Sequence, residues 1–182
     1  MRKPEDKDPS KVWAFDSVAM TSSRQLAISR TRVWDAQTGQ TLCATDIGYD
    51  NVEVNDDFPD REANLPWHYL GVTPDGRFIV CGHKWGSLEL RDVGTCDAVL
   101  ALEGHGGRVT DIAVTPDGRF VASCSEDSSV RLWDLHSAKE ITAFTGERTM
   151  SSCAIASDGR TIVAGDDAGQ VHFLRLVAAK DP

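Results

Sequence analysis

Three side chains of the types that build hydrolytic triads lie close together in the sequence: His105, Ser123 and Asp127. In such a triad the imidazole takes the serine proton and the carboxylate orients the imidazole, so that the serine becomes a nucleophile. Ser123, however, lacks the G-x-S-x-G turn that exposes a nucleophile, because it stands in the run Arg119–Ser125, "RFVASCS". It is expected in the middle of a strand, where substrate has no access. The sequence therefore predicts a structural role for these three residues.

Two further groups carry potential metal ligands. Residues 50–57, "DNVEVNDD", hold carboxylates and amides but not the ordered Asp-x-Asn/Asp-x-Asn/Asp-Gly spacing of a calcium loop. The cysteines are odd in number, scattered, and never form a C-x-x-C pair: Cys43, Cys81, Cys96, Cys124 and Cys153. This spacing predicts buried thiols in a reducing cytosol and neither a metal site nor a disulfide framework. We expect no cofactor and no catalytic residue.

Composition excludes several classes of partner. The 182-residue chain is 41% hydrophobic and 26% charged, which is typical of a globular protein, and its net charge is −9. Nucleic acids and anionic membranes need a basic face, so neither is expected as a partner. No apolar run approaches the length of a membrane span, and residues 1–10, "MRKPEDKDPS", lack the apolar region of a secretory signal. We expect a cytoplasmic protein.

The elements that position these residues belong to an internal repeat. "PDGRFIVCGHKWGSLELRD" (74–92), "PDGRFVASCSEDSSVRLWD" (116–134) and "SDGRTIVAGDDAGQVHFLR" (157–175) are three copies of one pattern. Their Asp-Gly pairs begin at Asp75, Asp117 and Asp158, so the periods are 42 and 41 residues. A period of this length indicates one supersecondary unit stacked several times.

Each repeat reads as four short antiparallel strands. In the third copy, residues 108–115, 119–125, 129–135 and 140–144 alternate apolar and polar side chains, and Gly, Pro, Asp and Ser separate them. The predicted repeats are roughly 12–45, 67–102, 105–144 and 147–177, within a segment 11–178 flanked by tails 1–10 and 179–182. The first repeat is four residues short between its second and third strands. Residues 46–66, with seven carboxylates in 46–62 against one arginine, read as a protruding acidic loop.

The third repeat carries a family resemblance. "GH" at 104–105 and "WD" at 133–134, in a unit of about 42 residues, resemble the WD-repeat β-propellers. The last repeat is similar to the C-terminal blade of the long bacterial WD-repeat propellers that follow nucleotide-hydrolysing signalling modules in larger proteins. The resemblance implies a buried hydrogen-bonded tetrad of His105, Ser123, Asp127 and Trp133. The chemistry of the side chains agrees, since the indole donates only, the carboxylate accepts only, and serine and neutral histidine do both.

The other repeats depart from this tetrad. At the positions of Ser123, Asp127 and Trp133 the second repeat has Cys81, Trp85 and Arg91. The first repeat keeps only Trp34-Asp35. At the four tetrad positions of the fourth repeat we place Glu147, Ala164, Ala168 and Leu174. One repeat in four is therefore expected to carry the network.

The predicted fold is all-β, a β-propeller of about four four-stranded antiparallel blades that forms an incomplete ring. Rings of the resembled family most often have seven blades, so four should leave a gap with unpaired strand edges. Apolar side chains at the end of the array, such as Ile155, Ile162 and Val171, are then expected to meet water. We therefore expect dimers, higher oligomers or association with a larger propeller.

The predicted function is that of a non-enzymatic scaffold that binds a partner protein through the loop rim of the propeller. The partner-binding candidates are Lys84, Trp85, Arg108, Glu126, Arg148, Asp166 and Asp167. Trp85 either folds back on its own blade or is an exposed anchor. Together with the acidic loop the rim is net acidic, which favours a partner with a basic face. The alternatives are a sensor segment of a larger signalling nucleotide hydrolase, a segment that completes another chain's propeller, and a propeller hydrolase or dehydrogenase, for which the inner strands carry few ionisable groups.

Overall fold

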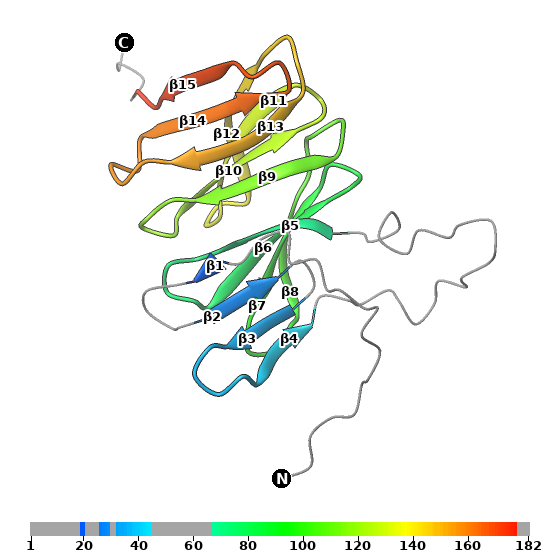
Figure 1. The fold of residues 1–182 in the computed structure, drawn as a ribbon, viewed down its shortest axis with the longest axis vertical. Coiled ribbons are helices and arrows are strands. Elements are labelled where there is room, and N and C mark those ends of the chain that lie inside the picture. Colours follow the sequence, from blue (N-terminus) through cyan, green and yellow to red (C-terminus); the bar gives the residue numbers. More distant parts are fainter. Residues whose placement is uncertain (1–18, 21–25, 30–31, 45–66, 178–182) are drawn as a thin grey trace, which may run out of the picture.

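The computed structural model describes residues 19–20, 26–29, 32–44 and 67–177. These residues form four antiparallel sheets that follow one another along the chain, and each strand pairs with the next (Figure 1). The sheets are stacked in sequence order and do not close into a ring within the described residues (Figure 1). The predicted tails 1–10 and 179–182 and the acidic loop 46–66 lie outside these residues.

The sheets correspond to the predicted blades. The first contains β1 (Ala19–Met20), β2 (Leu26–Ser29), β3 (Arg32–Asp35) and β4 (Thr41–Ala44). The second contains β5 (Trp67–Val72), β6 (Phe78–His83), β7 (Leu88–Asp92) and β8 (Ala98–Leu102). The third contains β9 (Val109–Val114), β10 (Phe120–Ser125), β11 (Ser129–Asp134) and β12 (Lys139–Thr145). The fourth has β13 (Met150–Ile155), β14 (Thr161–Asp166) and β15 (Val171–Arg175).

The Asp-Gly signal fixes the turn between the first two strands of a blade. In the third blade the Thr115 hydroxyl donates to Asp117 Oδ1 at 2.5 Å, and the same oxygen accepts from the Arg119 amide at 2.9 Å. Gly118 follows with φ near 72°, a left-handed conformation in which glycine is not strained. The matching threonine and aspartate of the second blade make the same bonds. Because these contacts are local, the turn recurs wherever the sequence recurs.

The aspartate at the end of the third strand closes the next turn. Asp134 Oδ1 accepts the backbone amides of His136 at 2.8 Å and Ser137 at 3.2 Å. Asp35 and Asp92 bind the amides two and three residues ahead in the same way. The aspartate of the "WD" pair is therefore a turn-forming residue, which satisfies backbone donors that the turn would otherwise leave unpaired.

The apolar cores lie between neighbouring blades. The second and third blades each contribute one sheet face to the core before them and one to the core after them, as expected for a repeat array. The middle core includes Leu88, Leu102, Val109, Val121 and Trp133, all at most 2% exposed. The core between the last two blades includes Ile162, which is buried. The prediction that Ile162 meets water is wrong, because its side chain points toward the third blade; Val171 on the opposite face is exposed.

The prediction of five thiols is wrong for two of them. Cys43 in β4 and Cys96 in the turn after β7 form a disulfide with sulfur atoms 2.06 Å apart, which ties the first blade to the second. The two cysteines are 53 positions apart in the sequence, and only the packing of the two sheets brings them together. Cys81 and Cys124 are buried free thiols, and burial raises the pKa of Cys81 to about 12.

Candidate interaction rim and its supporting network

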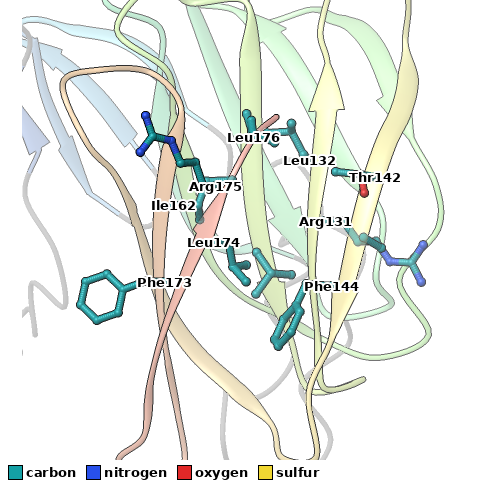
Figure 2. A pocket seen from close by; sticks show the side chains of 11 residues that line it. Arg131, Leu132, Thr142, Phe144, Ile162, Phe173, Leu174, Arg175 and Leu176 are labelled. Carbon is teal, nitrogen blue, oxygen red and sulfur yellow. The ribbon is translucent and has the colours of Figure 1, made fainter. Parts of the chain in front are cut away.

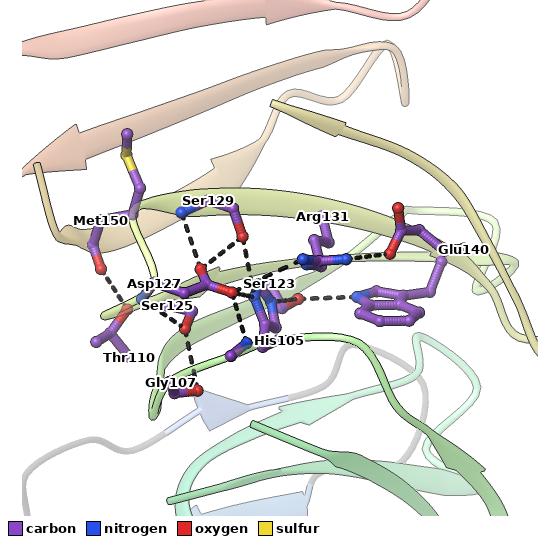
Figure 3. Close-up of polar contacts among 12 residues, drawn as sticks. His105, Gly107, Thr110, Ser123, Ser125, Asp127, Ser129, Arg131, Glu140 and Met150 are labelled. Atoms are coloured by element: carbon purple, nitrogen blue, oxygen red, sulfur yellow. Dashed lines mark hydrogen bonds and ion pairs between the residues drawn. The ribbon is translucent and has the colours of Figure 1, made fainter. Parts of the chain in front are cut away.

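The structure brings all four predicted tetrad residues together in the third blade (Figure 3). The Trp133 indole Nε1 donates to Ser123 Oγ at 2.8 Å, and Ser123 Oγ lies 2.7 Å from His105 Nε2. His105 Nδ1 lies 3.0 Å from Asp127 Oδ2. With the imidazole proton on Nδ1, every donor in this chain meets an acceptor. The Ser123 side chain is fully buried and its proton is directed at the imidazole, so the geometry stabilises the blade and offers no open nucleophile.

The protonation states follow from the surroundings. Burial lowers the pKa of His105, and this effect outweighs the hydrogen bond and the charge of Asp127. Burial by itself would raise the pKa of Asp127, but hydrogen bonds from Ser129, the Gly106 amide and His105 hold it well below its ordinary value. The site therefore contains a neutral imidazole and a carboxylate anion at neutral pH.

The network is larger than the four residues expected from the sequence. Ser129 donates its hydroxyl to Asp127 Oδ1 at 2.6 Å and its amide to the same oxygen at 2.9 Å. The Gly106 amide reaches Asp127 Oδ2 at 2.8 Å, and the Ser125 hydroxyl donates to the Gly107 carbonyl at 3.1 Å. These bonds join the loop that enters the blade to the turn between β10 and β11. Serines flanking Asp127 were the only signal in the sequence, and serine is too common in turns to stand out.

The other blades replace this network with different contacts. In the second blade Arg91, at the tryptophan position, binds Glu89 at 2.6 Å and the Cys96 carbonyl at 2.9 Å. In the fourth blade β13 begins 41 residues after β9, so Gly146 and not Glu147 stands where His105 stands; the predicted alignment was one residue off. His172 lies in hydrogen-bonding distance of Asp166 there, with His172 Nε2 3.0 Å from Asp166 Oδ2.

The network holds a rim of loops in place at one end of the blades. The Glu126 amide donates to the Arg108 carbonyl at 2.9 Å, which ties the turn of the third blade to its entry loop. The turn of the second blade rests on the same loop: a Cβ at Gly86 would lie 2.3 Å from the His105 carbonyl oxygen. In the fourth blade the Asp167 amide bonds to the Thr149 carbonyl at 3.0 Å. The predicted rim loops are therefore neighbours in space.

Most of the predicted partner-binding residues are accessible on this rim. Trp85 is 72% exposed, and Lys84 Nζ lies 4.7 Å from the centre of its ring. Of the two alternatives for this tryptophan, the structure shows the exposed one. Arg108 and Glu126 form a surface ion pair at 3.6 Å, with side chains 46% and 48% exposed. Arg148 and Asp167 are exposed as well.

The inclusion of Asp166 among the partner-binding residues is wrong. Its side chain is buried, and its Oδ1 accepts the amides of Ala168 at 3.0 Å and Gln170 at 2.9 Å. Its other oxygen contacts His172. The carboxylate therefore closes the turn between β14 and β15 and is not presented to a partner.

The described residues also bear on two other kinds of site. They contain no group of three or more histidine, cysteine and acidic side chains arranged to hold a metal ion. Nor do they contain a helix with the length and apolar character needed to cross a membrane.

The comparisons with known proteins agree with this architecture. Residues 94–134, which span the third blade up to the end of β11, match the family model described as "WD domain, G-beta repeat". The chain is similar in fold to the crystal structure of the Cps50 (Swd1) beta-propeller domain from Myceliophteria thermophila, with a TM-score of 0.60 and 18% sequence identity. The similarity covers 62% of this chain and 35% of that one, so the chain spans about a third of the length of that domain. No curated protein matches the sequence. The predicted all-β propeller architecture is confirmed.

Proposed function

We propose that this chain, a β-propeller segment with a WD repeat at its centre, is a non-enzymatic scaffold that binds a partner protein through its loop rim. The exposed Trp85 carries the proposal. A tryptophan at 72% exposure leaves a large apolar surface in water, whereas Trp133 of the next blade is almost completely buried. Tryptophan and arginine dominate the binding energy of protein interfaces, because they bury much area with few rotatable bonds.

The setting of Trp85 supports an anchor that is held ready for a partner. Its turn includes Gly86, with φ near 91°, and Gly86 packs against the entry loop that His105 anchors. Lys84 lies over one face of the indole, a cation–π arrangement that limits the motion of the ring. A partner therefore meets a side chain whose position is already restricted, which lowers the entropy lost on binding.

The described rim residues carry basic and acidic groups in equal number, so their net charge does not select a partner. Among the described rim residues, the basic groups Lys84, Arg108 and Arg148 are matched by Glu126 and Asp167 together with Glu147, so no sign prevails. The proposed preference for a partner with a basic face therefore rests on the acidic segment 46–66. In that case the charge of the acidic segment acts mainly on the association rate of the partner, and salt weakens this effect.

The test compares Trp85→Ala with Ile141→Ala, which removes an exposed apolar side chain on β12, away from the rim. Proteins from the host lysate that are retained by the wild type and by Ile141→Ala, but lost by Trp85→Ala, identify the partner. With the purified partner we expect Trp85→Ala to weaken binding by about 30-fold or more. Its melting temperature should not change, because the side chain is exposed. Equal affinity of all three proteins for the partner would refute the rim as the binding surface.

Deletion of residues 50–61 tests the acidic contribution separately. The cost of closing a loop changes slowly with its length, so stability should change by less than about 1 kcal/mol. With a basic partner we expect slower association and a weaker dependence of the association rate on salt. An unchanged association rate would contradict the basic-partner preference and leave the Trp85 proposal standing.

A segment that completes another propeller is the second candidate function. The exposed face of the fourth blade favours it, since Phe173 is 75% and Val171 57% exposed there. Phe173→Ser should then abolish association while Trp85→Ala leaves it intact, which is the reverse of the pattern expected for the rim.

A further inference from the structure

Among the described residues, the outer strand of the fourth blade, β15, has no strand paired to its outer edge. Its sheet contains three strands within the described residues, whereas each of the other three sheets contains four. The Leu176 amide bonds to the Arg160 carbonyl at 2.9 Å, on the β14 side of the sheet. Because backbone groups alternate in direction along a strand, the amides and carbonyls of Phe173 and Arg175 face the outer edge. The second blade shows how such a group is paired when a fourth strand follows: the Asp92 amide, at the position of Arg175, donates to the Asp97 carbonyl just before β8 at 3.1 Å.

A groove of about 290 Å³ runs beside this edge, between β15 and the outer strands of the third blade (Figure 2). Leu132, Phe144, Ile162 and Leu174 are among the side chains that line it. Figure 2 shows Phe173 pointing away from the groove, to the opposite face of the sheet. A strand added to β15 would thus place every second side chain in the groove.

The corresponding position between the second and third blades shows what covers this groove in a complete pair of blades. Leu102 of β8, one period before Phe144, is only 2% exposed, because it is covered by a complete third blade and packs in one core with Trp133. Phe144 is half-buried, since the blade that follows it has no fourth strand among the described residues. Leu174 stands where the third blade has Trp133, and the smaller side chain widens the groove. The groove therefore has the shape of a missing strand.

At the end of this edge, the described residues also lack the arginine–aspartate ion pair that the second and third blades contain. In the second and third blades the arginine of the Asp-Gly-Arg turn meets the aspartate that ends the third strand: Arg77 and Asp92 are 3.7 Å apart, and Arg119 and Asp134 are 3.0 Å apart. In the fourth blade the aspartate is replaced by Arg175.

Two exposed arginines, Arg160 and Arg175, thus share one corner without an ion pair to any described carboxylate. Hydrogen bonds from the Arg160 amide and from Thr161, with a smaller contribution from the charge of Arg175, lower the pKa of nearby Asp158 to about 2. The oxygens of that carboxylate, however, are hydrogen-bonded to the Arg160 amide and to the amide and hydroxyl of Thr161. The corner still offers its guanidinium groups to a carboxylate from outside.

We propose that the outer edge of β15 binds an extended acidic segment of a partner protein, which adds to the fourth blade as its fourth strand. The main-chain groups of Phe173 and Arg175 pair with the segment, its alternate apolar side chains enter the groove against Phe144 and Leu174, and its carboxylate meets Arg160 and Arg175. Strand addition of this kind takes affinity from the backbone and specificity from the pockets. The surface and the binding mode are distinct from those of the loop rim, so the two proposals stand independently.

The experiment uses two fluorescein-labelled peptides and the full chain, with binding followed by fluorescence anisotropy. One peptide has the sequence of residues 137–145, which contains β12, and the other carries Lys139→Glu. In the third blade Lys139 pairs with Asp134, so this position of an added strand is opposite Arg175. We expect the glutamate peptide to bind the wild-type chain about fivefold more tightly than the lysine peptide. In the Arg175→Glu variant the preference should reverse.

Two further controls separate strand addition from general stickiness. Methyl groups on the peptide amides at positions 142 and 144, which would donate to β15, should abolish binding, whereas methylation at 141 and 143 should not. Phe144→Ser removes an apolar side chain that the added strand would contact in the groove, so it should weaken peptide binding about tenfold. Its circular dichroism spectrum should match that of the wild type, which shows that the fold is retained.

Several results would overturn the proposal. These are no binding of either peptide at about millimolar concentration, equal affinity for both peptides, or unchanged binding of the peptide that is methylated at positions 142 and 144. Sedimentation of the chain alone supplies the remaining test. A dimer that excludes the peptide and dissociates in Phe144→Ser would assign the edge to a second copy of this chain, and the partner-strand proposal would be wrong.

Discussion

Removal of the Asp127 carboxylate should destabilise the third blade more than any other single polar deletion on it. Four hydrogen bonds converge on this group: from His105 Nδ1 at 3.0 Å, the Gly106 amide at 2.8 Å, the Ser129 amide at 2.9 Å and the Ser129 hydroxyl at 2.6 Å. Its side chain is only 14% exposed, so water replaces the lost acceptor poorly. Asp127→Ala leaves several donors without partners at once.

The expected magnitude follows from those donors. A buried donor left unsatisfied costs roughly 1–3 kcal/mol, but the Ser129 hydroxyl can rotate to another acceptor and the exposed side of the turn admits some water. We therefore expect Asp127→Ala to lower the free energy of unfolding by about 3 kcal/mol and His105→Ala by about 2 kcal/mol. The double variant should lose about 3 kcal/mol, because both residues belong to one network, and the coupling energy is then about 2 kcal/mol.

Urea unfolding followed by circular dichroism measures these differences as shifts of the midpoint at constant slope. The matched control is Glu126→Ala, the neighbouring carboxylate, whose side chain forms an exposed ion pair with Arg108 at 3.6 Å. Exposed pairs of this kind contribute less than about 1 kcal/mol. If Asp127→Ala cost no more than Glu126→Ala, or if the two network variants were additive, the structural role of the tetrad would be refuted.

Three other predictions concern pH, redox state and backbone strain. The pKa values of both His105 and Asp127 are lower in the folded chain than their ordinary values of 6.5 and 3.8, so the unfolded chain binds more protons. The stabilisation from both groups is therefore complete above pH 6.5. The urea midpoint should fall as the pH drops from 6.5 toward the folded-state pKa of His105, and again as it drops from 3.8 toward that of Asp127. Reducing the disulfide between β4 and the β7–β8 turn, which closes a 53-residue separation, should lower the melting temperature by about 10 °C, from an entropic contribution of about 4 kcal/mol. Gly86→Ala should cost more than Gly169→Ala in the same urea assay, since both have a positive φ but only the first would place its Cβ 2.3 Å from a carbonyl oxygen.

The parts of the fold that rest on local contacts were predictable from the sequence. The Asp-Gly pairs mark turns whose hydrogen bonds lie within five residues, as between Thr115 and Asp117, so each copy of the motif makes the same turn. The strands between the turns followed from their alternation. The shortened turn predicted for the first blade stays a prediction, because residues 30 and 31 between β2 and β3 lie outside the described residues; β2 and β3 have four described residues each, against six in β10 and β11. Periodicity places a strand but not its ends.

The features set by contacts between blades were not predictable. Cys43 and Cys96 have no informative spacing, and their bond depends on how the first two sheets pack. Cys96 adopts φ near 63°, a conformation that the equivalent turn of the first blade gives to Gly39, and nothing in the sequence identifies a cysteine that will do this. The burial of Asp166 was not predictable for a similar reason. An aspartate in a turn can face solvent or its own turn, and the contacts with His172 and with two backbone amides determine that Asp166 faces its own turn.

The exposure of Trp85 is explained by the loss of the tetrad in the second blade. It occupies the place of Asp127 in a blade where serine and tryptophan are replaced by Cys81 and Arg91, so no chain of donors and acceptors draws a side chain inward. Arg91 has turned to Glu89 instead, and the tryptophan remains outside. The blade that lost the network thus gained an exposed aromatic side chain on a turn that the next blade still fixes.

The complete network lies in the one blade that both proposed surfaces touch. The turn that carries Trp85 rests on the carbonyl of His105, and the groove beside β15 is bounded by β11 and β12 of the same sheet. A surface at the end of a repeat array has one neighbour and opens easily, whereas an inner blade has two. Amide exchange should therefore be slowest around Ser123 and Trp133 and faster in the first and fourth blades. Rigidity at the centre allows the rim and the strand edge to present fixed groups to their partners, although each is formed in part by a less stable neighbouring blade.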